Sequence, residues 1–260
     1  MWPYLRVYKE FLRTSFAEAT SYRLHFVLLI VMDNIFYLTS LLGVSFIFDH
    51  IHNIGPWDRA EFMFFIAFML AVDHLHMTFV SENFWEFSYG IRIGVLDFIL
   101  LKPLNAIFTI FFRLIRPATM FNFFIPLGTL IYFGLQLHLS VYSWLLVPFM
   151  LLLALTLQTS LEILMSMSMF WLVQADAVNF MRMQFQSLSR WPDFIYRYYA
   201  RKFFTLAFPL LLIGSVPVKI LLNLTEWKLA SCSLLAIAVT WLLIAITWRR
   251  GLRSYESASS

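Results

Sequence analysis

Long apolar blocks alternate with short polar segments along the whole chain, and this pattern predicts membrane helices. The block at 62–72, for example, contains no charged residue. A helix needs about 20 apolar residues to cross a bilayer core of about 30 Å. We therefore expect an all-α integral membrane protein, with residues 1–260 forming one transmembrane domain of six spans. The expected spans are 24–48, 62–80, 118–137, 141–173, 203–222 and 229–248.

Two further expectations concern the third span and the ends of the chain. We expect Pro126 to kink the third span, because proline removes a backbone hydrogen bond inside a helix. Residues 1–23 are too charged to cross a bilayer, and we expect them to form an interfacial helix on the membrane. The apolar stripe of that helix is Leu5, Tyr8, Leu12 and Phe16. We expect the tail 254–260 to be disordered.

The composition excludes several classes of protein. Apolar residues make up 61% of the chain, charged residues only 13%, and the mean hydropathy is +0.75. This composition is incompatible with a soluble protein whose surface faces water. The net charge of +4 does not indicate nucleic-acid binding, because the cations gather at the ends of the expected helices. Cys232 is the single cysteine, so an intrachain disulfide and a CxxC metal site are excluded.

The segment 92–105, RIGVLDFILLKPLN, interrupts the apolar pattern. Gly94 relaxes the backbone before it and Pro103 restricts the residue in front of it, so we expect a short helix over 95–101. Its apolar side, Leu96, Ile99 and Leu100, would dock on another subunit, with Asp97 and Lys102 setting the orientation. An ordinary loop with a solvated charge pair is the alternative. The residues we single out here are Arg92, Gly94, Leu96, Asp97, Leu100, Leu101, Lys102, Pro103, Leu104 and Asn105.

The pattern Arg-x-Gly-x-Leu-Asp, followed by Leu-x-Lys-Pro-Leu-Asn, resembles the loop between the second and third membrane helices of ABC-2 transporter permease subunits. The resemblance implies a permease of an ATP-driven exporter, in which 81–117 is a cytoplasmic coupling region. It also implies a cytoplasmic ABC ATPase dimer as partner, a second permease subunit, identical or paralogous, and contact with membrane lipid. The resemblance further implies that the protein is located in the cytoplasmic (inner) membrane of a prokaryote.

Positive charges predict the orientation. In the six-span arrangement, sixteen lysines and arginines fall on the side of the N-terminus and three on the other side. Because cytoplasmic loops are enriched in these residues, both termini and the segment 92–105 are expected in the cytoplasm.

The resemblance also offers a second arrangement. ABC-2 permeases have a re-entrant helix pair before the last span, and Pro209, Gly214 and Pro217 interrupt the apolar block at 203–222 in that manner. In this version a polar fifth span covers 174–188 and residues 190–202 lie outside, which changes the charge count to twelve against seven. Both arrangements keep six spans and cytoplasmic termini.

The sequence contains no GxxxxGK[ST], HExxH or GxSxG pattern. A chain without the first cannot hold ATP in the P-loop manner. We therefore expect no cofactor to bind directly, with ATP and Mg²⁺ held by the partner ATPase, and no catalytic residue in this chain.

Polar and ionisable side chains inside the expected spans form the second group of candidates. They are Asp33, Asn34, Asp73, His74 and His76. Such groups are costly in a bilayer and face the interior, a cavity or a partner. We expect Asp33 and Asp73 to lie nearly level in an antiparallel pair, either in a polar packing cluster or along a substrate or proton path. The repeat of DHxH at 49–52 and 73–76 would separate its two copies by about 18 Å, which argues against one shared metal.

Two other functions are consistent with these residues. A membrane-embedded enzyme would use Asp33, Asp73 and His74, the one candidate acid/base cluster. A non-transporting scaffold would bind an ATPase without coupling its hydrolysis to movement.

Overall fold

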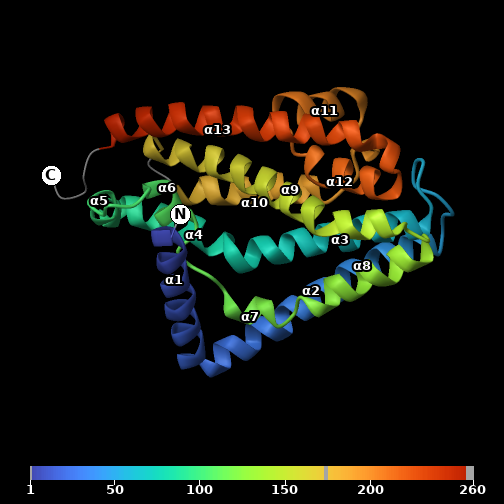
Figure 1. The fold of residues 1–260 in the computed structure, drawn as a ribbon, viewed down its shortest axis with the longest axis horizontal. Helices are drawn as coiled ribbons and strands as arrows, with labels where there is room; N and C mark the ends of the chain where they lie inside the picture. The colour runs from blue at the N-terminus through green and yellow to red at the C-terminus, as the bar shows by residue number, and fades with distance from the viewer. Residues whose placement is uncertain (1, 173–174, 256–260) are drawn as a thin grey trace.

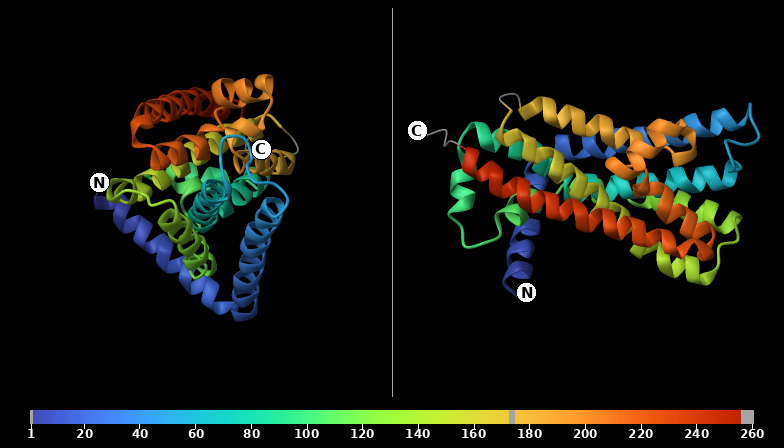
Figure 2. Two further views of the ribbon diagram at one scale, coloured as in Figure 1. Left: turned by 90° about the vertical axis from the view of Figure 1, so that its right-hand side faces the viewer. Right: turned by 90° about the horizontal axis from the view of Figure 1, so that it is seen from above.

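The computed structural model describes residues 2–172 and 175–255, and these form an elongated bundle of helices (Figure 1). One end, which we call the motif end, holds the segment 92–105 together with the described N- and C-terminal residues (Figures 1 and 2). The other end, which we call the loop end, holds the connections 49–58, 137–140 and 223–228. The described part of the chain contains no β-strand, so the all-α prediction is confirmed.

The helices of the bundle body run between its two ends, and α2 slants relative to the others (Figure 1). They are α2 (Arg23–Phe48), α3 (Arg59–Phe79), α8 (Phe124–Gln136), α9 (Val141–Ser166) continued by η1 (Met167–Phe170), α10 (Ala175–Ser189) and α13 (Leu229–Ser254). Among the described residues, five helical segments are long and apolar enough to cross a membrane, or six if a bent pair counts as one span. The chain is therefore an integral membrane protein by the length and composition of its helices.

Shorter helices connect the long ones. At the motif end these are α4 (Ser81–Arg92), α5 (Val95–Leu100), α6 (Ala106–Phe111) and α7 (Pro117–Met120). Toward the loop end they are η2 (Asp193–Ile195), α11 (Tyr198–Lys202), the π-helix η3 (Phe203–Ala207), α12 (Leu212–Leu222) and η4 (Leu224–Lys228).

The core is centred on α3. All side chains from Phe62 to Val72 are buried, which explains why this block carries no charge. Gly214 lets α12 approach closely, because a Cβ atom there would lie 2.4 Å from the Met69 sulfur. By contrast, α2 and α13 keep most of their apolar side chains exposed, as expected for helices that face lipid or another subunit.

Two helix boundaries differ from the sequence-based expectations. The third span breaks at 121–123 rather than at Pro126, which is the third residue of α8, where its missing N–H has no helical partner. The sequence also predicts an interfacial helix over 106–116, but the helix after the motif ends at Phe111. Arg116 is extended, with φ −103° and ψ 91°, because it precedes Pro117.

The apolar block at 203–222 is not a straight span. Tyr198–Ala207 and Leu212–Leu222 are bent by 95° relative to each other. The preceding segment lies at the loop end, where the rings of Phe194 and Trp57 are 4.9 Å apart. This contact agrees with the second arrangement, in which 190–202 follows a polar helix across the bundle, and it contradicts the placement of 190–202 beside the motif.

The helix α1 (Trp2–Ser21) crosses the motif end at a steep angle to the bundle (Figure 1). Its packing face is Tyr4, Tyr8 and Phe11, whose rings surround Phe108 of α6. Leu5 and Phe16 of the predicted stripe remain exposed. The helix therefore presents one aromatic face to the chain and a separate apolar edge outward.

The predicted tail 254–260 overlaps the described chain at two residues. Ser254 ends α13, and Tyr255 packs against the core near α5. Residues 256–260 lie outside the described residues.

Candidate functional site

The segment 92–105 folds as a short helix between two turns, as its sequence predicts. Gly94 has φ 75°, the left-handed region that glycine adopts without a steric penalty. The helix α5 then covers Val95–Leu100. Asn105 accepts a hydrogen bond from the Phe108 amide and so caps α6. Leu101, Lys102 and Pro103 are exposed at the tip between the two helices.

The apolar residues of α5 point in two directions. Leu96 is 1% exposed and packs with Phe84, Phe87 and Phe111 of the same chain. Leu96 is therefore an internal anchor and not part of a partner-facing surface, which corrects the expectation for it. Phe98 and Leu101 are 69% and 82% exposed. These two residues form the outward apolar pair, which we call the tip pair, and Leu100 lies at its edge.

Polar contacts attach the motif to the end of the bundle. Arg92 Nη1 lies 2.9 Å from Asp176 Oδ2 at the start of α10, and the Ser88 hydroxyl donates to the same carboxylate at 3.0 Å. Asp97 lies beside the Tyr255 hydroxyl, and burial together with the Asp97 charge raises the pKa of Tyr255. The motif is thus connected to both α10 and the end of α13.

The helix α10 carries a polar face with residues spaced three or four apart, which places them on one side. These residues are Asp176, Asn179, Arg182 and Gln186, and Arg190 directly after the end of the helix continues the spacing. Asn179 donates to the Phe84 carbonyl, so the face looks toward α4 at the motif end. Further along it meets α3 and α9 in the middle of the bundle.

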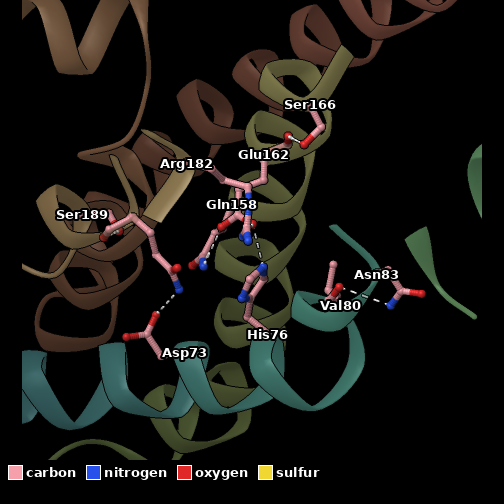
Figure 3. A network of polar contacts seen from close by, with 10 residues as sticks. Asp73, His76, Val80, Asn83, Gln158, Glu162, Ser166, Arg182 and Ser189 are labelled. Carbon is pink, nitrogen blue, oxygen red and sulfur yellow. Dashed lines mark hydrogen bonds and ion pairs between the residues drawn. The ribbon is translucent and has the colours of Figure 1, made fainter. Parts of the chain in front are cut away.

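The centre of the network is a buried acid between two basic side chains (Figure 3). Arg182 Nη1 donates to Glu162 Oε2 at 2.6 Å, and His76 Nε2 lies 2.8 Å from the same oxygen. Gln158 donates to the other oxygen at 3.2 Å. The Arg182 guanidinium also lies 4.4 Å from the centre of the Phe84 ring. Because all three charged or ionisable groups are buried, each depends on the others for compensation.

A second acid binds the same helix nearer to the loop end. Asp73 accepts hydrogen bonds from Gln186 at 3.0 Å and from Arg190 at 2.6 Å. Figure 3 shows Asp73 and His76 projecting from α3 toward α10 and α9. Arg190 also lies over the Phe36 ring of α2, at 5.2 Å. Asp73 is therefore fully paired within the chain.

Asp33 and Asn34 belong to a separate polar layer between α2 and the break after α7. Asn34 donates to the Asn122 side chain at 2.9 Å, and Asp33 is buried next to the same amide. Tyr37 shares a hydrogen bond of 2.9 Å with His74 Nδ1 and lies within the electrostatic range of both Asp33 and Asp73. Both acids therefore act on Tyr37, but each has its own hydrogen-bond partners.

The sequence-based selection missed Glu162, Arg182 and Arg190. Glu162 carried a usable signal, because it is an acid inside an otherwise apolar block. Arg182 and Arg190 carried none, since a polar stretch that includes them is also typical of a loop. Among the residues that the structure describes, no group of three or more His, Cys, Asp or Glu side chains is arranged to hold a metal ion.

Residues 34–259 match the family described as ABC-2 family transporter protein. The chain belongs to the ABC-2 transporter family. This membership identifies it as a membrane-spanning component of an ABC transporter, of the kind that has no ATPase site of its own. The matched region of this ABC-2 transporter chain includes the motif, the buried network and the bent helix pair at 198–222, and α1 precedes it. Comparisons with curated proteins and with solved structures gave no match.

Proposed function

We propose that this ABC-2 family chain is the permease subunit of an ATP-driven exporter and acts with a second permease subunit. A separate cytoplasmic ATPase dimer would bind ATP and Mg²⁺ and dock on the tip pair. The observation that carries the proposal is the exposure of Phe98 and Leu101 on a helix whose other side is fixed by Leu96. Export is the direction that the sequence resemblance implies.

The contacts of α5 support a mechanical role. A partner that moves the tip pair also moves Arg92, which is ion-paired to Asp176 at the start of α10. Arg182 and Arg190 then connect α10 to Glu162 and Asp73 in the bundle. Separating the buried Arg182–Glu162 pair costs several kcal/mol per uncompensated ion, so α10 moves together with α9. We infer that ATP-driven displacement of α5 reaches the spans through α10.

The charge distribution supports a cytoplasmic motif end. With α10 as the fifth span, Arg182 is buried inside the bundle, which leaves eleven lysines and arginines on the motif side and seven on the loop side. The positive-inside rule places the richer side in the cytoplasm. The proposed location is the cytoplasmic membrane of a prokaryote, with lipid or a second subunit covering the exposed faces of α2 and α13.

Cysteine accessibility tests this topology. In a Cys232→Ala background, single cysteines at Asn53, Ser140 and Tyr196 should react with an impermeant maleimide added outside intact cells. A cysteine at Phe98 should react only after the inner face is opened. Labelling of the Phe98 position from outside would invert the orientation, and protection of Tyr196 would return the segment 190–202 to the motif side.

Purification tests the proposed function itself. The chain isolated from its native membranes should carry an ABC ATPase, identified by mass spectrometry, and the complex should hydrolyse ATP in a vanadate-sensitive manner. A sample from which no ATPase can be recovered, even after crosslinking in intact membranes, would contradict the proposal. ATP hydrolysis without movement of any compound in reconstituted vesicles would instead favour a scaffold.

A further inference from the structure

A groove lies between the bent helix pair at 198–222 and the last long helix, and we call it the α12–α13 groove. Its volume is about 500 Å³. One wall is η3 and α12, the other is α13, and Leu161 and Leu164 of α9 form the floor. Figure 1 shows α12 beside the first turns of α13. Because three elements contribute to it, the groove encloses a ligand more fully than a bare helix face does.

The groove has the length of an extended hydrocarbon chain in one leaflet. Along α13 its lining begins at Leu229 and ends at Leu243. At 1.5 Å per residue this distance is about 21 Å, which exceeds half of a bilayer core of about 30 Å. Apolar side chains dominate this length, including Leu235 and Val239, which are both exposed.

Charged side chains gather at the loop end of the groove. Lys219 Nζ donates to Asp193 Oδ1 at 2.8 Å, and Arg201 Nε donates to Asp193 Oδ2 at 3.0 Å. Burial alone would raise the pKa of Asp193, but the hydrogen bonds and charges of Lys219 and Arg201 outweigh it and hold the pKa below its ordinary value. Two cations thus share one carboxylate, so the cluster has a net charge of +1. Both cations remain partly exposed.

The wall next to this cluster is irregular backbone. Residues Phe203–Ala207 form a π-helix, and Thr205, Leu206 and Ala207 line the groove. Short π-helical segments are rare and occur frequently at functional sites. Here the π-helix lies at the bend between α11 and α12.

We propose that the α12–α13 groove binds an anionic membrane phospholipid, with an acyl chain along α13 and the phosphate at Lys219 and Arg201. The excess cation selects a lipid with net negative charge, because a zwitterionic headgroup brings its own cation to the cluster. The apolar length selects a chain-bearing ligand over a soluble phosphate. The site is independent of the proposed ATPase docking surface, which lies at the other end of the bundle.

The single cysteine of the chain is a natural reporter of occupancy. Cys232 is exposed and lines the groove, so a bound chain should shield its thiol. Delipidated protein in detergent is titrated with phosphatidylglycerol or with phosphatidylcholine of the same chains, and alkylation of Cys232 by N-ethylmaleimide is followed by intact mass. We expect phosphatidylglycerol to protect the thiol at about tenfold lower concentration, the effect of one additional charge-assisted contact.

Variants at the polar end of the groove distinguish recognition of the headgroup charge from apolar contact with the acyl chain. Lys219→Gln should remove the preference for phosphatidylglycerol, whereas Lys219→Arg should keep it. Lys228→Gln, which removes a cation that does not line the groove, is the matched control and should also keep it. Equal protection by the two lipids in the unaltered protein, or an unchanged preference in Lys219→Gln, would overturn the proposal.

Two further measurements complete the test. The first determines whether the bound phosphate belongs to a lipid or to a soluble compound, and the second tests the groove with a variant that leaves Lys219 unchanged, in case Lys219→Gln does not fold. Glycerol phosphate without a chain should give no protection, and protection equal to that of the lipid would assign the site to a soluble phosphate instead. Val239→Trp should fill the groove without touching the charged cluster. Native mass spectrometry should then show loss of the retained phosphatidylglycerol, and retention at the level of the unaltered protein would overturn the groove as the binding site.

Discussion

Replacing Glu162 with leucine should lower the free energy of unfolding by about 3–5 kcal/mol, because breaking a buried ion pair leaves an uncompensated charge. Arg182 is 1% exposed, and Glu162 is its ion-pair partner. His76 is equally buried and faces the same carboxylate. Reversible unfolding of purified protein by SDS in mixed micelles, followed by helical circular dichroism, measures the change.

Two controls distinguish charge compensation from simple packing. Glu162→Leu combined with Arg182→Met should recover most of the stability, since a buried pair replaced by apolar groups of similar volume is often neutral. Glu86→Leu removes the partner of Arg113 in a partly exposed pair and should cost less than about 1 kcal/mol. If the Glu162→Leu protein unfolded at the same SDS fraction as the unaltered one, the network would not hold α10 to α9.

The largest expected effect on assembly comes from the tip pair. Phe98→Asp with Leu101→Asp should release the ATPase in a pull-down, since loss of one central apolar anchor costs about 2 kcal/mol or more, which is roughly thirtyfold in affinity. Both side chains are mostly exposed, so membrane insertion and unfolding should be unchanged. The measurement is the amount of ATPase that co-purifies, together with the SDS unfolding midpoint of the variant.

Leu96→Asp changes a buried residue of the same segment and so contrasts with the exposed double variant. It places a charge among Phe84, Phe87 and Phe111, so its first effect should be a lower unfolding midpoint. Lys102→Gln changes an exposed cation beside the tip pair and should alter the association rate more than the stability of the complex. Full co-purification of the ATPase with the Phe98 and Leu101 double variant would show that docking occurs elsewhere.

The motif helix shows how far sequence reasoning reaches at the candidate site. Gly94 and Pro103 predicted the limits of α5 to within one residue, because their backbone restrictions are local. The exposed side of the helix was predicted incorrectly at Leu96, which is buried, whereas Phe98 is exposed. Spacing of i, i+3, i+4 identifies residues that share a side of a helix, and it does not say whether that side meets the same chain or another one. In a helix of only six residues, the sequence does not determine whether Leu96 or Phe98 is the buried residue and which of them is exposed.

The sequence left the placement of the polar helix α10 undecided for a related reason. Residues 174–188 fit either a cytoplasmic loop or a span. A hydropathy value assigns the same cost to a charged residue whether or not an opposite charge pairs with it in the folded protein. Arg182 and Arg190 are tolerated in the bundle since Glu162 and Asp73 face them from α9 and α3. The partners are 20 and 117 residues away along the chain, so only their proximity in the fold reveals the compensation.

The sequence by itself determined the class of the protein, the apolar long helices, the motif helix and membership in the ABC-2 family, because each of these depends on local composition or on residue patterns. The tertiary structure decided that 190–202 lies at the loop end, that Leu96 is internal and Phe98 external, and that Lys219, Asp193 and Arg201 close one end of an apolar groove. These features depend on which side chains meet across the bundle, and helix packing sets those contacts between residues that are distant in the chain.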